Sequence, residues 1–342
     1  MTSQRTRHFV QPARSRSARA YFAPAEAPAP YEPGTREVTA ALAAAARSTP
    51  LPGALDGAVT FAGETALVAE DALYAAMGAV ALGQLAAARQ TLAALFDAQD
   101  EDGRLPSALR PTGGWHARVL TWLGRPDHAL VEAEYEGGVV ATALAIWLGA
   151  EYTEATGDRQ FLQEHHAAFE RAAAWLERQE RGGLPSQDGA APTMLAGVLV
   201  YRALRAMGEM AMPRGEAIAA ARYWARAASL RERVNAAFWD AGRGCYREDG
   251  PGQANMLAVA TGLAARGQAL AILAAADDGL AVTAAPGFHA LAAAREGEAP
   301  RARQAIEQDL RGTLDAATAG RLGLALAALK PAPAPTAHVV NG

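Results

Sequence analysis

The sequence predicts an all-α fold in which helical hairpins close into an (α/α)6 toroid, and three observations lead to this prediction. Alanine- and leucine-rich segments, each long enough for several helical turns, follow one another from about residue 37, with Gly and Pro between them. Val, Ile and Thr rarely alternate with polar residues, so strands have little support. A loop motif also recurs after two of the predicted helices. The chain is therefore expected to form a ring of helices.

Gly, Pro and Asp mark where the predicted helices begin and end. Gly157-Asp158 ends one helix and caps the next, and Pro213 suits the first turn of another. Twelve such helices would make six hairpins. The predicted helices are 37–47, 68–82, 85–98, 137–156, 159–179, 192–211, 214–238, 253–264, 266–275, 285–297, 300–312 and 318–329.

The recurring loop motif constrains the architecture. The segment 99–107 ends in Gly-Arg-Leu-Pro-Ser, and the segment 179–186 ends in Gly-Gly-Leu-Pro-Ser. Each follows a long predicted helix, and the offset of about 80 residues is too long for a solenoid repeat built from one helical hairpin. Two hairpins per repeat fit the offset, and three such repeats close a ring of six.

Composition excludes several function classes. The chain has 342 residues, with 32 basic and 36 acidic side chains and a net charge of −4, so neither nucleic acid nor an anionic membrane is an expected partner. No run of about 18 uncharged apolar residues occurs, so no membrane span is predicted. The single cysteine, Cys245, excludes an intramolecular disulfide and a cysteine-based zinc cluster. We expect a globular protein of the cytoplasm.

The two ends of the chain differ in composition from the middle. Residues 1–35 carry five arginines before the first acidic residue, Glu26, followed by a Pro/Ala-rich stretch, and residues 331–342 are again rich in Pro and Ala. We expect an N-terminal arm over 1–35, one barrel domain over 36–330 and a tail over 331–342. The arm is either a solvated segment or a basic arm that touches a partner.

Short motifs follow one another in a fixed order between about residues 60 and 312. They include Phe61-Ala-Gly63 before Glu70-Asp71, the 99–106 loop, Val139-Val-Ala-Thr142, Thr156-Gly-Asp158, Trp175-Leu-Glu-Arg-Gln179 and Phe238-Trp-Asp240 before Gln253-Ala-Asn255. This ordered series resembles the six-hairpin glycosidase superfamily, which contains glucoamylases, trehalases, glycogen-debranching glucosidase domains and α-L-rhamnosidases. The resemblance implies a toroid whose central funnel holds an α-linked sugar of the glucoside or rhamnoside type.

The resemblance also implies roles for two acidic residues. In rhamnosidases of this type the general acid is a Glu seven residues before an Asp that holds the sugar, and Glu64 and Asp71 have that spacing. Such enzymes need an acid for the leaving oxygen and a base that activates water. The alternative is that Glu64 is a surface acid of a loop and that Asp71 favours the first turn of a helix.

Several family carboxylates are replaced in this chain. Val59 and Val140 stand where the pattern has aspartates, and the expected Trp-Glu base motif is replaced by 313–318, Thr-Leu-Asp-Ala-Ala-Thr. Asp188 lies in the loop where debranching-type enzymes have an acid, and either substitutes for it or forms a turn. The loss of these carboxylates argues against ordinary hydrolysis, so the chain is expected to be either a glycoside hydrolase or a degenerate relative.

Other polar residues are candidates for lining the funnel. The irregular segment 111–138 is too long for a simple connection, which is typical of functional loops or of a packing loop. Gln253 and His289 each lie at the start of a predicted helix, where their side chains either face the funnel or have a structural role such as capping. The candidates are Glu136 as acid or base, and Trp115, His116, Tyr135, Asp188, Gln253 and His289 as substrate-binding residues.

The sequence contains no metal or nucleotide motif, so no cofactor is expected. Three function classes stay open. The first is a glycoside hydrolase-like protein that acts on or binds a sugar. The second is a repurposed barrel that performs non-hydrolytic chemistry, as an isomerase or cyclase, on a small molecule. The third is a non-catalytic interaction protein. A fold resemblance alone does not choose among them.

Overall fold

The computed structural model describes residues 35–47, 67–111, 131–187, 189–247, 252–277, 286–312 and 314–329, and it confirms the all-α ring. The predicted arm and tail lie almost entirely outside the described residues. The helices of this part are α1 (Thr35–Arg47), α2 (Ala69–Ala81), α3 (Leu85–Asp97), α5 (Gly138–Thr156), α6 (Arg159–Glu164), α7 (His166–Arg178), α8 (Met194–Ala211), α9 (Ala217–Phe238), α10 (Gln253–Ala260), α11 (Arg266–Asp277), α12 (Phe288–Arg295), α13 (Ala299–Asp309) and α14 (Ala316–Ala328), with a 3₁₀ turn at Met212–Arg214.

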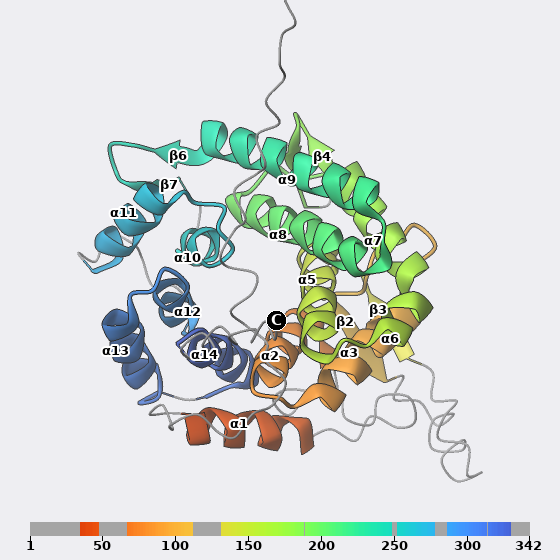
Figure 1. The fold of residues 1–342 in the computed structure, drawn as a ribbon, viewed down its shortest axis with the longest axis horizontal. Coiled ribbons are helices and arrows are strands. Elements are labelled where there is room, and N and C mark those ends of the chain that lie inside the picture. Colours follow the sequence, from red (N-terminus) through yellow and green to blue (C-terminus); the bar gives the residue numbers. More distant parts are fainter. Residues whose placement is uncertain are drawn as a thin grey trace, which may run out of the picture.

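Six helices form the inner wall of the ring. Helices α2, α5, α8, α10, α12 and α14 contact one another in that order, and α14 returns to α2, which closes the ring (Figure 1). The outer layer consists of α3, α6 with α7, α9, α11 and α13, and α1 completes it by packing on α14. The inner helices α2, α5, α8, α10 and α12 each lead into an outer helix, as in antiparallel hairpins, so the inner helices run parallel. Their N-termini therefore lie at one end of the ring.

Composition decides which helices are inner. Most side chains of α5 are buried around its whole circumference, as expected for a helix without a polar face. The outer helix α7 has buried residues on one face only, with Phe169, Trp175 and Leu176 among them. The alternation of apolar and amphipathic segments along the sequence thus builds two concentric layers.

Glycine permits the closest contact in the ring. A Cβ atom on Gly78 of α2 would lie 2.5 Å from the Gly320 Cα of α14, and the reverse substitution would collide with the Tyr74 backbone. The two helix backbones touch here, so no side chain fits between them. The closure of the ring between α14 and α2 depends on these two glycines.

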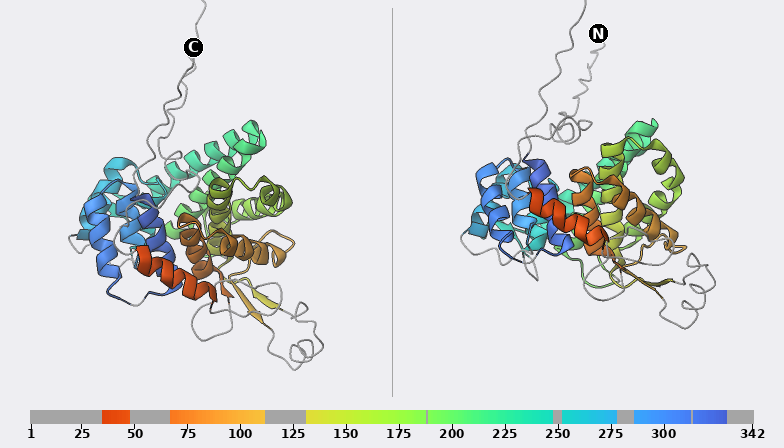
Figure 2. Two further views of the ribbon diagram at one scale, coloured as in Figure 1. Left: turned by 60° about the horizontal axis from the view of Figure 1, so that its bottom comes forward. Right: turned by 90° about the horizontal axis from the view of Figure 1, so that it is seen from below.

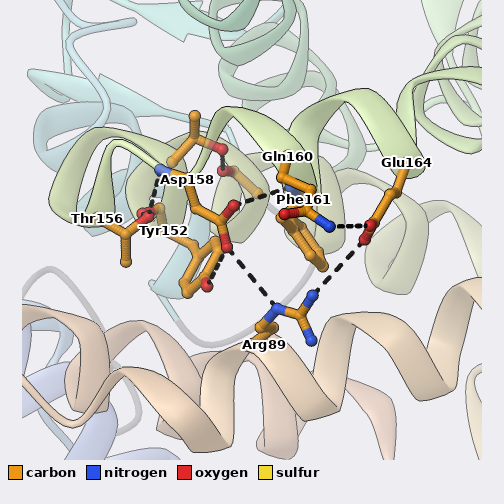
Figure 3. A network of polar contacts seen from close by, with 9 residues as sticks. Arg89, Tyr152, Thr156, Asp158, Gln160, Phe161 and Glu164 are labelled. Atoms are coloured by element: carbon orange, nitrogen blue, oxygen red, sulfur yellow. Dashed lines mark hydrogen bonds and ion pairs between the residues drawn. The ribbon is translucent and has the colours of Figure 1, made fainter.

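The predicted boundary at Gly157-Asp158 is confirmed, and a polar network surrounds it (Figure 3). Asp158 caps α6 by accepting a 2.9 Å hydrogen bond from the Phe161 N–H, and its other oxygen accepts one from the Tyr152 hydroxyl at 3.0 Å. Arg89 of α3 lies 3.7 Å from the same carboxylate. These contacts, the Phe161 N–H foremost, lower the pKa of Asp158. The cap thereby also ties the second hairpin to the first.

Two details differ from the sequence-based expectation. The helix predicted over 159–179 is interrupted at His165, whose ring packs on Phe96 and Phe161. Short strands also occur in segments predicted to be irregular: β1 (Leu67–Val68), β2 (Ala108–Pro111) and β3 (Val131–Glu134) form one antiparallel sheet, and β4 (Glu180–Arg181) with β5 (Leu184–Pro185) and β6 (Trp239–Asp240) with β7 (Cys245–Tyr246) form two hairpins. Strands of two to four residues are too short to show a period of two.

The sheets all belong to the segments that lead into inner helices. The three-stranded sheet projects from the ring beside α2 and α3 (Figure 2). Its β2–β3 pairing places Glu134 opposite Ala108, close to the start of α5. Among the helices that the structure describes, none is both long and apolar enough to cross a bilayer.

Candidate functional site

Acidic residues gather where the inner helices begin. Helix N-termini expose unpaired backbone N–H groups and carry partial positive charge, so carboxylates are stabilised near them. One cluster draws residues from the starts of α2, α10, α12 and α14 and from the end of α13. We call it the N-terminal cluster, and it consists of Glu70, Asp71, Gln253, His289, Asp309, Asp315 and Arg321.

Glu70 and Asp71 occupy the first turn of α2, and both are half-buried. The Gln253 amide of α10 donates a 3.4 Å hydrogen bond to the Glu70 carboxylate. Asp315 caps α14 by accepting a 2.6 Å hydrogen bond from the Thr318 N–H. Two acids of α2 are thus joined by a third acid, which caps α14, and by an amide from α10.

Arg321 is the buried cation at the centre of the cluster. Its Nε donates a 2.7 Å hydrogen bond to the Pro286 carbonyl, and Nη2 donates one of 3.0 Å to the Thr318 hydroxyl. The guanidinium also lies over the rings of Phe288, at 4.7 Å, and Tyr74, at 5.4 Å. Both hydrogen bonds go to uncharged oxygens, so the charge of Arg321 acts on the neighbouring carboxylates through space.

Burial shifts the acids of the cluster toward their protonated forms. It raises the pKa of Glu70, and the charge of Asp71 adds to this effect while the Gln253 hydrogen bond and Arg321 oppose it. Burial also raises the pKa of Asp71, with Asp315 adding to it and Arg321 opposing it. A carboxyl that keeps its proton to higher pH is suited to act as a general acid.

A second acidic contact lies on the α12 side of the cluster. The Asp309 carboxylate, at the end of α13, accepts a 2.7 Å hydrogen bond from the Gly287 N–H. Gly287 has a φ of 89°, a conformation that favours glycine, and it turns the chain into α12. Burial raises the pKa of Asp309, while the Gly287 N–H, His289 and Arg321 oppose the shift. His289 and Asp309 are therefore neighbours at this side of the cluster.

The structure brings together three of the site residues predicted from the sequence, namely Asp71, Gln253 and His289. Tyr135 and Glu136 lie elsewhere, in the turn before α5. The Tyr135 hydroxyl donates a 2.9 Å hydrogen bond to the Ala98 carbonyl, next to the outer helix α3, and Glu136 is exposed. The predicted Glu64, Trp115, His116 and Asp188 lie outside the described residues.

Four members of the cluster were not selected from the sequence: Glu70, Asp309, Asp315 and Arg321. Arg321 did leave a signal, because it is the one charged residue of the segment Ala316–Ala328, which is otherwise rich in Ala, Leu and Gly. A charge in the middle of a fully buried helix needs a polar environment. The residues that the structure describes contain no group of three or more His, Cys, Asp or Glu side chains placed to hold a metal ion.

Comparisons with known proteins bear on the fold. No family model matches the chain, and no curated protein matches it. Solved structures of glycoside hydrolases do match. The GH63 mannosylglycerate hydrolase of Thermus thermophilus, in complex with glucose, gives a TM-score of 0.59 at 16% identity over 86% of this chain and 99% of the other.

Rhamnosidases match as well. The enzyme from Klebsiella oxytoca with rhamnose bound gives a TM-score of 0.58 at 16% identity over 81% of this chain. The α-L-rhamnosidase of Streptomyces avermitilis, in complex with L-rhamnose, gives 0.54 at 18% identity over 79%. This chain spans 54% of the first enzyme and 26% of the second. At these identities the comparisons show the fold, which is that of the six-hairpin glycosidases.

Proposed function

We propose that the chain is a glycoside hydrolase-like protein that takes an α-linked sugar, of the glucoside or rhamnoside type, at the N-terminal cluster. The observation that carries the proposal is the pair Glu70 and Asp71, two adjacent carboxyls with raised pKa values, beside Gln253 and Arg321. Carboxylates and amides are the groups that bind sugar hydroxyls, and the fold is one that solved glycoside hydrolases share.

The proposed acid is Glu70 or Glu64. The structure supports Glu70, because its burial keeps the carboxyl protonated to higher pH, and the resemblance supports Glu64 through its spacing from Asp71. Either would donate a proton to the leaving oxygen, while Asp71 and Gln253 hold sugar hydroxyls. Glu136 and the aromatic residues of 111–138 are the remaining candidates for contacts with the sugar.

The proposed base is Asp315. It lies in 313–318, where the family resemblance expects the base, and its charge acts on Asp71 of the facing helix. One carboxylate oxygen is held by the Thr318 N–H, and the other is left to accept a proton from water. An inverting glycosidase needs about 6.5–9.5 Å between acid and base, which leaves room for that water.

Hydrolysis of chromogenic glycosides tests the proposal. The panel contains the 4-nitrophenyl α-L-rhamnoside, α-D-glucoside and α-D-mannoside with their β-anomers. We expect turnover of an α-glycoside that falls about 10²- to 10⁴-fold in Glu70→Gln or Glu64→Gln, whichever is the acid, and in Asp315→Asn. Glu232→Gln, an exposed position on α9, is the matched control. No turnover of any sugar, or turnover that survives all three changes, would contradict the proposal.

One observation favours the second function class. Val140, at a position where the family has an aspartate, is half-buried in the first turn of α5 and packs against the apolar core. An apolar side chain there removes a sugar contact and leaves room for a less polar substrate. If the glycoside panel gives no turnover, a repurposed barrel acting on a small apolar molecule becomes the better account. Restoring the acid, as Val140→Asp, would then gain no glycosidase activity.

A further inference from the structure

A large cavity lies at the end of the ring opposite the N-terminal cluster. Its volume is about 1040 Å³. The walls come from the C-terminal parts of α5, α8, α10 and α12, from the turns that follow α5 and α8, and from residues of α6 and α9. Pockets for small molecules usually measure about 300–1,000 Å³, so this cavity can enclose a ligand of drug-like size. Neither the sequence motifs nor the proposed function uses it.

Large apolar side chains make up part of the cavity lining. Trp147, Leu162 and Met210 belong to it, together with Met212 and Trp224. Met212 is 48% exposed and Trp224 38% exposed, which is high for side chains of this size. The Trp224 indole lies against the backbone of α8 at Gly208, where any Cβ atom would collide with it. An indole and a flexible thioether held at an open cavity form a surface that suits a flat or chain-like apolar group.

The lining also carries charged side chains, and most of them are paired. Arg202 of α8 lies 2.8 Å from Glu209 and 3.2 Å from Glu151, and Glu151 also accepts a 2.7 Å hydrogen bond from the Trp147 indole N–H. Arg205 lies 3.6 Å from Glu209. At the rim, Arg214 is paired with Glu216 at 2.8 Å. The guanidinium groups of these three residues are therefore already engaged by carboxylates.

Glu154 differs from the paired acids. It lies one helical turn after Glu151 on α5, and among the described residues no basic side chain comes within ion-pair distance of it. The groups that face it are Glu151 on its own helix, Arg202 and Glu209 of α8, and Arg295 of α12. Glu154 is exposed in the open cavity, but desolvation by the surrounding walls, followed by the charges of Glu151 and Glu209, raises its pKa to about 7. Within the cavity wall this carboxylate lacks a counter-ion.

We propose that the cavity binds an amphipathic organic cation, an arylalkyl amine, whose ammonium group pairs with Glu154 while its ring packs on Trp224 and Met210. Arg202 is paired with Glu151 and Glu209, so a bound cation would supply the positive charge that neutralises Glu154. An anion is disfavoured beside Glu154, because it would meet the negative charges of Glu154 and Glu151, and Arg202, Arg205 and Arg214 are already paired with carboxylates. This site is separate from the N-terminal cluster and does not depend on the function proposed there.

Three probes that differ only in charge test the proposal on the full chain: tryptamine as the cation, tryptophol as the neutral analogue and indole-3-acetate as the anion. Isothermal titration calorimetry at pH 8.5, where the alkylamine is protonated and Glu154 is ionised, should show tryptamine binding about five- to tenfold more tightly than tryptophol. Indole-3-acetate should bind more weakly than either. Equal affinities for the three probes, or no binding of tryptamine at millimolar concentration, would overturn the proposal.

A variant and a pH series identify the carboxylate. In Glu154→Gln the preference for tryptamine over tryptophol should vanish, whereas the matched control Glu164→Gln, an exposed acid of α6 outside the cavity, should keep it. In the unaltered chain the preference should also fall between pH 8.5 and pH 5.5 as Glu154 takes up its proton. A preference that survives Glu154→Gln, or that does not change with pH, would show that Glu154 is not the counter-ion.

Discussion

The two ends of the ring each hold a buried arginine among carboxylates, but the two arginines are used differently. Arg202 lies at the end of the ring where the inner helices finish. It makes direct ion pairs with Glu151 and Glu209, and these raise its pKa although burial acts to lower it. Arg321 lies at the end of the ring where the inner helices begin. It donates its hydrogen bonds to a carbonyl and a hydroxyl, and burial lowers its pKa. One end contains a closed ion-pair network, whereas at the other end the hydrogen bonds of Arg321 go to uncharged oxygens and not to the nearby carboxylates.

The pKa shifts of the carboxyl groups differ between the two ends in the same way. Burial alone would raise the pKa of Glu151, yet Arg202, Arg295 and the Trp147 N–H lower it overall. At the other end burial prevails, and the pKa values of Glu70, Asp71 and Asp309 are all raised. An acid held in an ion pair stabilises the fold, whereas buried acids with a raised pKa and no ion-pair partner are candidates for catalysis. We therefore assign the proposed chemistry to the end of the ring where the inner helices begin.

The largest expected effect comes from removing each arginine in turn. Arg202→Met leaves Glu151 buried and charged without its partner, which should cost about 3–5 kcal/mol of unfolding free energy. Arg321→Met removes no direct ion pair but leaves the buried Thr318 hydroxyl without its donor, which should cost about 1–3 kcal/mol. Urea denaturation at pH 7 measures both. Equal losses would contradict the distinction between the two ends.

A smaller effect is expected from Glu154. Its pKa is raised by folding, so its contribution to stability is fully present below the pKa of the unfolded chain, near 4.5, and is lost as pH rises through about 7. Glu154→Gln should therefore leave stability unchanged at pH 4.5 and stabilise the fold at pH 8.5. Because the side chain is exposed in the open cavity, the gain should be only about 1 kcal/mol. A loss of stability at pH 8.5 would mean that Glu154 has a counter-ion after all.

The smallest effect distinguishes two helix caps. Asp158 caps α6 beside Arg89, and Asp158→Ala should cost about 1 kcal/mol through loss of the cap. Asp315→Ala removes a similar cap from α14, but it also removes a negative charge that raises the pKa of Asp71, so it should cost only a few tenths of a kcal/mol. Thermal unfolding of the two variants at pH 7 gives the comparison, and a greater loss for Asp315→Ala would reverse it.

The fold was largely predictable from the sequence, because its helices are local. The segment 85–98 predicted the outer helix α3 to within one residue, and Gly157-Asp158 predicted the boundary that the structure shows. The short strands were missed because two residues carry no period. The break at His165 was missed because contacts with Phe96, far away in the sequence, stabilise it.

The site was predictable only in part. Asp71, Gln253 and His289 could be selected because each begins a helix, but nothing local shows that α2 meets α14 across the whole length of the chain. Glu70, Asp315 and Arg321 become one cluster only when Gly78 and Gly320 bring those two helices into contact. The cavity at the other end is likewise built from four helix ends, which no periodicity relates to one another.

A crossed binding experiment tests the central claim, that the two ends have separate roles, most directly. Isothermal titration calorimetry of methyl α-L-rhamnoside, methyl α-D-glucoside and tryptamine is run on the unaltered chain, Glu70→Gln and Glu154→Gln. The account predicts that Glu70→Gln weakens binding of a sugar and leaves tryptamine unaffected, and that Glu154→Gln does the reverse. Sugar binding that is lost in Glu154→Gln and kept in Glu70→Gln would place the sugar in the C-terminal cavity and contradict the account.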